Sequence, residues 1–154
     1  MPITMFRGTF EHTIDTKGRL SIPSKFREVL LGKGDERLVI TNFVIDSMRC
    51  LDVYPLDEWA HFEEEIKKKP KFDRRMMIFQ SYYLGGACEC TVDKQGRILI
   101  PPLLRQYVNL KRDVVLVAAL EKFRVWDKET WKKVFTEAEG KLMQDPDFLG
   151  DLGL

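Results

Sequence analysis

Apolar and polar residues alternate in two short stretches near the start of the chain, at 9–14 and 20–22. An alternation of period two places every second side chain on one face, which predicts half-buried strands. The four residues after the first stretch, Asp15-Thr16-Lys17-Gly18, have the composition of a tight turn. Aspartate can accept hydrogen bonds from backbone N–H groups two residues on, and glycine readily adopts a positive φ. The pattern therefore predicts a strand, a turn and a returning strand.

A short helix is predicted immediately after the returning strand. Pro23 suits the first turn of a helix, because the N–H that proline lacks would have no partner there. Residues 24–31 carry one apolar stripe, and Gly32 and Gly34 are expected to end the helix. Runs of β-branched residues then predict strands at 37–41 and 50–54.

The whole pattern recurs 78 residues further along the chain. Residues 8–27 and 86–105 align without a gap, and nine of the twenty columns are identical. Such an internal repeat indicates one supersecondary unit that is used twice. The second copy predicts strands at 114–118 and 122–126.

The two copies differ in length between their later strands. Residues 52–59 match 124–131 with an offset shorter than 78, so the first copy carries about six extra residues in the region 41–49. Insertions between regular elements usually lie at the surface. We therefore expect a surface loop there.

Helical periodicity of apolar residues follows each copy. A helix is predicted at 56–69, Pro70 ends it, and a second helix is predicted at 72–84. After the second copy, Asp127 is a good N-cap for a further helix. The segment after Pro146 shows no period and is expected to be mobile. The aromatic residues of these helices are expected to pack in the core or against another subunit rather than to hold a cofactor; they include Trp59, Phe62, Trp131 and Phe135.

Each repeated unit has about 50 residues, too few to bury a large core alone. Two intertwined units could share one pseudo-twofold barrel, with both turns on the same side. The predicted fold class is α+β, a tandem pseudo-twofold repeat with additional helices. The predicted boundaries are 5–54 for the first repeat, 55–84 for a helical linker with oligomer contacts, 85–126 for the second repeat, 127–145 for a C-terminal helix and 146–154 for the tail.

Composition indicates a globular protein of the cytoplasm. Of the 154 residues, 44% are hydrophobic and 32% are charged, and the net charge is +1. No apolar run approaches the roughly 20 residues of a membrane span, and the stretch 1–7 lacks the features of a secretory signal. Three cysteines are an odd number, and Cys88-Glu89-Cys90 is spaced too tightly for a zinc knuckle. We expect reduced thiols and neither a metal nor a cofactor.

The repeated turn is the candidate functional element. Asp15 and Arg19 flank the first turn, so the carboxylate could hold the guanidinium in one orientation. An oriented arginine suits a phosphate contact or bidentate recognition of guanine, and Lys17 adds a point charge. Arg97 and Lys94 repeat the arrangement. The residues expected to shape the turns are Asp15, Gly18, Asp93 and Gly96, and the further cations that could widen the basic surface are Arg7, Lys25, Arg27 and Arg105.

A structural explanation competes with this functional one. The pairs Asp15–Arg19 and Asp93–Arg97 could merely hold their turns closed, although a surface ion pair contributes only about 0–1 kcal/mol. The near-neutral net charge does not itself indicate nucleic-acid binding. The residues alone leave both explanations open.

An enzymatic function is not expected. Catalysis would require a base, a nucleophile and a cleft, and the sequence contains no glycine-rich phosphate loop, nucleophile elbow or histidine and cysteine cluster. His12 alternates with Phe10 and Ile14 and is expected to be a half-buried strand residue. No small-molecule substrate is predicted.

The stretch Met5-Phe6-Arg7-Gly8 and the run from His12 to Arg27 closely resemble the opening of MraZ proteins, which are bacterial transcriptional regulators of the division and cell-wall gene cluster. Asp93, Arg97 and Pro101 resemble the second copy of that family's repeat. The resemblance covers roughly residues 5–145.

The resemblance implies two AbrB-like swapped-hairpin units in one β-barrel, and a ring-shaped homo-oligomer that is octamer-like in relatives. It also implies a nucleoid-associated repressor that binds double-stranded DNA at short direct repeats in its own promoter. The family's Asp-x-x-x-Arg element falls on Asp15 with Arg19 and on Asp93 with Arg97. Gln95 stands where the first copy has Lys17, so unequal DNA binding by the two turns is expected. The alternative is a ring-forming interaction or structural protein without direct DNA binding.

Overall fold

The computed structural model describes residues 5–154; residues 1–4, part of the stretch in which no secretory signal is expected, lie outside the described residues. The first half contains β1 (Thr9–Thr13), β2 (Arg19–Ser21), α1 (Ser24–Lys33), β3 (Arg37–Ile45), β4 (Met48–Pro55), α2 (Leu56–Lys67) and α3 (Arg74–Tyr83). The second half contains β5 (Cys88–Thr91), β6 (Arg97–Leu99), α4 (Pro102–Val108), β7 (Asp113–Ala119), β8 (Lys122–Asp127), α5 (Lys128–Gln144) and α6 (Phe148–Asp151).

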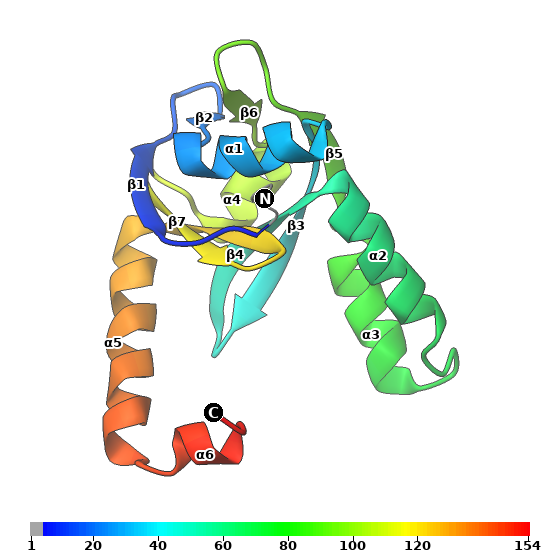
Figure 1. Ribbon diagram of the computed structural model, residues 1–154, viewed down its shortest axis with the longest axis vertical. Helices are drawn as coiled ribbons and strands as arrows, with labels where there is room; N and C mark the ends of the chain where they lie inside the picture. Colours follow the sequence, from blue (N-terminus) through cyan, green and yellow to red (C-terminus); the bar gives the residue numbers. More distant parts are fainter. Residues whose placement is uncertain (1–4) are drawn as a thin grey trace.

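Strands of the two halves are interleaved. Six strands form one antiparallel sheet in the order β1-β7-β8-β4-β3-β5, and β2 pairs with β6 in a separate two-stranded ribbon (Figure 1). The first strand of each half therefore pairs with the third strand of the other half, β1 with β7 and β5 with β3. Neither half could complete its sheet without the other.

The core lies between the sheet, the ribbon and the short helices. Phe6 contacts Phe26 and Phe123 edge-on, with ring centroids 5.2 Å apart in both pairs. Leu20 and Ile98, the central residues of the ribbon, are fully buried against this cluster. The alternation that predicted the ribbon strands thus directs one side chain of each strand inward.

The helices α2 and α3 form a hairpin that projects to one side of the molecule (Figure 1). It packs on the sheet through a second apolar cluster, in which Tyr54, Trp59 and Tyr83 are buried. Beneath this cluster the buried Asp52 accepts hydrogen bonds from the Tyr83 hydroxyl and, at 2.8 Å, from Arg124 Nε. The aromatic residues of α2 therefore anchor the hairpin, as the sequence predicted for a core contact.

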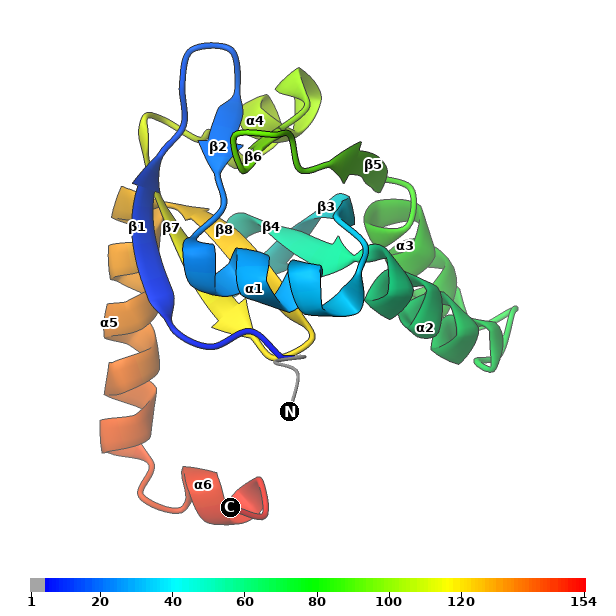
Figure 2. The same cartoon turned by 45° about the horizontal axis from the view of Figure 1, so that its top comes forward.

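The helix α5 extends away from the sheet (Figures 1 and 2). Asp127 caps its N-terminus by accepting from the Glu129 N–H at 3.3 Å, as predicted. Trp131 packs against Trp126 with ring centroids 6.2 Å apart, but Phe135 further along is 55% exposed. No residue of α5 is buried, so most of its apolar stripe faces outward.

Two local predictions were wrong. The extra residues at 41–49 form no loop, because β3 and β4 continue through them to a two-residue turn at Asp46 and Ser47. Both turn residues have positive φ, 49° and 66°, the geometry that matches the twist of paired strands. Gly32 lies inside α1, and only Gly34, at φ 70°, ends it. The mobility of the segment after Pro146 stays a prediction; the segment contains the short helix α6.

The three cysteines are free thiols, as predicted. Burial raises the pKa of Cys90 to about 12, so this thiol stays protonated at neutral pH. No helix within residues 5–154 is long and apolar enough to cross a membrane.

Candidate nucleic-acid interface

The ribbon of β2 and β6 brings the two repeated arginines to one surface. Leu20 pairs with Ile98 at its centre, and both point into the core. Because side chains alternate across a strand, Arg19 and Arg97 point to the opposite, outer face. They are diagonal neighbours across the pair, a relation that separates side chains by about 7–8 Å.

The first turn holds its arginine through Asp15. Asp15 Oδ1 accepts from the backbone N–H groups of Lys17 at 3.0 Å and Arg19 at 2.8 Å. Asp15 Oδ2 accepts from Arg19 Nε at 2.7 Å, which leaves the outer guanidinium nitrogens free of this contact. The bond from the Arg19 N–H, with help from the Arg19 side chain, lowers the pKa of Asp15 to about 2. The carboxylate is therefore charged throughout the physiological range.

The second turn repeats this arrangement with one difference. Asp93 Oδ1 accepts from the N–H groups of Gln95 at 2.8 Å and Arg97 at 3.0 Å, and the Arg97 N–H bond lowers the pKa of Asp93. The Arg97 Nε contact with Asp93 Oδ2 is longer, at 3.3 Å. In addition, the Gln95 side-chain oxygen accepts from Arg97 Nη2. Gln95 thus occupies part of the Arg97 guanidinium, whereas Lys17 leaves Arg19 unoccupied in this way.

Each turn is supported by an arginine of the other half. Gly18 and Gly96 have φ of +89° and +77°, a conformation that favours glycine. A Cβ at Gly18 would lie 2.6 Å from Arg105 Nε, and one at Gly96 would lie 2.7 Å from Arg27 Nη1. Arg27 and Arg105 are half-buried and pack over these turns, so the structure places them behind the outer face of the ribbon.

The other predicted cations occupy different places. Lys17 and Lys94 are exposed in the turns themselves, and Lys25 is exposed in the first turn of α1. Phe6 forms a β-bridge with Leu120 just before β1 begins. Arg7 follows Phe6, so it lies at the end of β1 that is distant from the first turn. The structure therefore brings Lys17 and Lys94 together with the arginines and does not bring Arg7 to them.

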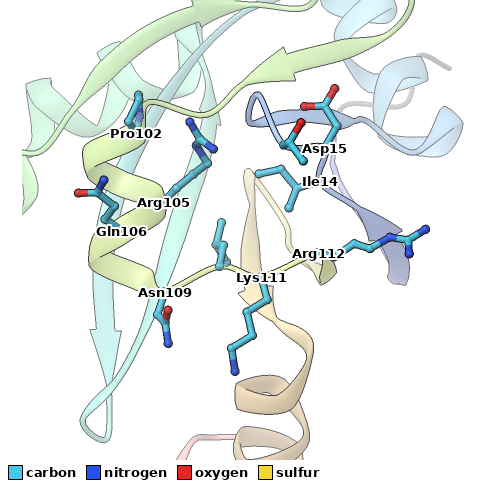
Figure 3. Close-up of a pocket in the computed structure, with 10 residues that line it drawn as sticks. Ile14, Asp15, Pro102, Arg105, Gln106, Asn109, Lys111 and Arg112 are labelled. Carbon is cyan, nitrogen blue, oxygen red and sulfur yellow. The ribbon is translucent and has the colours of Figure 1, made fainter.

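Two cations that the sequence analysis did not select lie beside the first turn. Lys111 and Arg112 line a cavity of about 610 Å³ together with Asp15 and Arg105 (Figure 3). Lys111 and Arg112 are adjacent basic residues just before a predicted strand, and this pair is the sequence signal that could have identified them. Its closeness to a turn almost a hundred residues away in the chain depends on the pairing of β1 with β7.

His12 is half-buried in β1, as predicted, and its Nδ1 lies 2.8 Å from the Ser21 carbonyl oxygen. In the part of the chain that the structure describes, no three histidine, cysteine or acidic residues are grouped so that they could hold a metal ion. The charged groups at the ribbon and its turns are the guanidinium and ammonium groups and the carboxylates of Asp15 and Asp93, which are paired with the arginines.

This arrangement is suited to recognising nucleic acid. A two-stranded β-ribbon fits the major groove of DNA, where arginine can donate two hydrogen bonds to guanine O6 and N7. An arginine held by a carboxylate loses less side-chain entropy when it forms those bonds. The lysines on either side can meet phosphates.

Comparisons with known proteins point in the same direction. A family model described as "MraZ protein, putative antitoxin-like" matches residues 5–80 and again 83–148. A protein of Thioalkalivibrio sulfidiphilus is 45% identical over 129 residues, which cover 84% of each chain. One of Caldicellulosiruptor saccharolyticus is 37% identical over 150 residues, which cover 97% of this chain and 100% of the relative. Both relatives are named transcriptional regulator MraZ.

Proposed function

Because the chain belongs to the MraZ family, we propose that it is a sequence-specific DNA-binding transcriptional regulator. The observation that carries the proposal is the pair of oriented arginines, Arg19 and Arg97, on the outer face of one ribbon. Neither half of the molecule alone would form this face.

In the proposed complex the ribbon enters the major groove. Arg19 and Arg97 read base edges, and Asp15 and Asp93 keep the guanidinium groups in place. Lys17 in the first turn and Lys94 in the second turn contact phosphates. Arg27 and Arg105 act from behind by supporting the turns. Arg19 carries more of the recognition, because Gln95 competes for Arg97.

The direct test replaces the arginines in the full chain. Arg19→Ala should weaken binding to the promoter fragment by about 1–3 kcal/mol and relax the sequence preference, because one base contact is lost. Arg97→Ala should have a smaller effect. Fluorescence anisotropy with the promoter fragment and with a scrambled fragment measures both quantities.

Arg75→Ala is the matched control, since Arg75 is an exposed arginine on α3 that is also paired with an aspartate, Asp73. It removes the same charge at a distance from the ribbon and should leave the sequence preference unchanged. Unchanged affinity and preference in Arg19→Ala would exclude the first turn from the interface.

We further propose that the target is a set of short direct repeats in the protein's own promoter, upstream of division and cell-wall genes, and that binding represses transcription at the nucleoid. The target and the repression are proposed from the resemblance to the family. A reporter fused to that promoter should rise when the gene is deleted, and removal of the repeats should abolish the response.

Self-association as a ring would explain how a protein of net charge +1 binds DNA firmly. Neighbouring subunits that occupy successive repeats gain from effective concentration. The proposed contact surfaces are the apolar faces that this chain leaves uncovered, at Met77 and Ile78 on α3 and at Phe135 and Leu142 on α5. Such an interface must be heterologous and must close on itself.

The same uncovered faces support the second candidate function, a ring-forming interaction protein that does not bind DNA. A mobility shift with the promoter fragment separates the two candidates. A defined oligomer that retards neither the promoter fragment nor random DNA would favour the interaction protein.

A further inference from the structure

The pseudo-twofold relation of the two halves allows equivalent positions to be compared directly. Ile14 and Val92 are aligned residues that lead into the two turns. The Ile14 N–H donates to the Arg112 carbonyl at 2.8 Å, and the Val92 N–H donates to the Glu36 carbonyl at 3.1 Å. Arg112 and Glu36 therefore occupy equivalent positions beside the first and second turns.

Charge is reversed at these positions. Lys111 and Arg112 stand beside the first turn, whereas Asp35 and Glu36 stand beside the second. At the next position the charges are the other way round. The first side has Asp113, which pairs with β1, and the second side has Arg37, which pairs with β5 at the equivalent place. One such change reduces the contrast between the two sides but does not cancel it.

Ion pairs engage the cations beside the second turn but not those beside the first. Beside the second turn, Arg27 Nε lies 3.2 Å from Glu36 Oε1 and Arg37 Nη2 lies 2.8 Å from Asp35 Oδ2, so both cations are neutralised. Arg105 is the equivalent of Arg27, and its Nε donates to the Ile100 carbonyl at 3.1 Å. Among residues 5–154, no carboxylate forms an ion pair with Arg105, Lys111 or Arg112.

The unpaired cations surround a recess in the surface. The cavity of about 610 Å³ lies between α4 and the first turn, and Lys111 and Arg112 leave its rim in different directions (Figure 3). The one carboxylate in its lining, Asp15, is already engaged by Arg19. The surface at the rim of the recess therefore carries two cations near the first turn, which holds the arginine that is proposed to read bases.

Resting on the proposed DNA binding, we infer that Lys111 and Arg112, at the rim of this recess, contact the DNA phosphate backbone, while the equivalent surface at Asp35 and Glu36 does not. The ribbon is nearly symmetric and could by itself lie on a duplex in two opposite directions. A phosphate contact on one side only selects one direction. A fixed direction is what successive binding to repeats of the same orientation requires.

The test uses the full-length double variant Lys111→Ala/Arg112→Ala and the promoter fragment. Binding is measured by fluorescence anisotropy over a series of salt concentrations. The slope of log K against log salt should fall by about 2, because each lost phosphate contact removes about one released counterion. The preference for the promoter over a scrambled fragment should not change, since phosphate contacts carry no sequence information.

Two further variants make the result specific. Lys67→Ala/Lys68→Ala removes the same charge from exposed positions at the C-terminal end of α2 and should leave the slope unchanged. Arg112→Lys keeps the charge and should keep most of the slope. Ethylation interference should show that the Lys111→Ala/Arg112→Ala variant loses its dependence on phosphates at one flank of each bound site.

The outcomes separate this inference from the proposed function. If the unmodified chain binds the promoter and Arg19→Ala relaxes its preference, an unchanged slope in Lys111→Ala/Arg112→Ala overturns the one-sided contact alone. An equal loss of slope in the α2 variant also overturns it, because the effect would then be one of net charge. Failure of the unmodified chain to bind DNA overturns both.

Discussion

Asp15 illustrates how one side chain can combine structural and functional roles. Three hydrogen bonds converge on its carboxylate, two from backbone N–H groups and one from Arg19 Nε. Replacing Asp15 with a neutral residue therefore affects both the shape of the turn and the direction of the arginine. The contribution of the carboxylate charge to stability can be measured through its pH dependence.

The folded protein holds the pKa of Asp15 at about 2, below its ordinary value of 3.8. A depressed pKa means that the charged form contributes to stability above about pH 4, and that this contribution is lost as the pH falls towards 2. We expect the loss of thermal stability between pH 4 and pH 2 to be smaller in Asp15→Asn than in the unmodified chain. Calorimetry over this range measures the difference, and parallel curves for the two proteins would contradict it.

Gly96 provides a second test at single-residue scale. Gly96→Ala places a Cβ at φ +77° and 2.7 Å from Arg27 Nη1, so we expect a loss of at least about 1 kcal/mol in the free energy of unfolding. Gly140→Ala is the control, because a Cβ there meets nothing within 4 Å and should stabilise α5 by about 0.5–1 kcal/mol. Denaturant titration measures both; a neutral Gly96→Ala would mean that the turn can relax.

Among the elements, the α2–α3 hairpin is attached by a polar network as well as by apolar contacts. The Tyr83 hydroxyl donates to the buried Asp52 and lies 2.7 Å from the Tyr54 hydroxyl, and burial raises the pKa of Tyr83. The network is complete, since no buried side-chain nitrogen or oxygen in residues 5–154 lacks a partner. A complete network of this kind favours one position of the hairpin on the sheet.

Tyr83→Phe should therefore destabilise the protein by about 1–3 kcal/mol, because it leaves Asp52 with one partner fewer in a buried site. Tyr107→Phe is a milder comparison, because the Tyr107 hydroxyl bonds only to the hydroxyl of the half-buried Tyr82. Chemical denaturation measures the two losses. Equal losses would show that the carboxylate finds a new partner.

For the whole molecule, the exchange of strands between halves has a direct consequence. The fragment 1–84 lacks β7 and β8, so β1 would have no partner and β4 would lose one of its two neighbours. We expect this fragment to be unfolded as a monomer, or to recover order only by pairing with a second copy. Circular dichroism with size-exclusion chromatography measures this, and a folded monomeric fragment would contradict the dependence of each half on the other.

Much of the fold and part of the candidate site could be predicted from the sequence. Alternation identified β1 and β2, the aspartate and glycine pairs identified the two turns, and the N-cap at Asp127 identified the start of α5. These features are local, so residues a few positions apart carry all the information. The extension of β3 and β4 to a tight hairpin was missed because Asp46 and Ser47 lack the glycine that usually marks such a turn.

The sequence by itself determined that one unit is used twice, that each copy has a turn in which an aspartate can hold an arginine, and that the chain is a MraZ-like protein. Only the tertiary structure decided which strands pair. That pairing places Arg19 and Arg97 on one face, sets Arg105 behind Gly18, and brings Lys111 and Arg112 to the first turn. The physical reason is that an alternating pattern specifies which face of a strand is buried but not which strand lies beside it. Contacts between residues distant in the chain depend on that second choice.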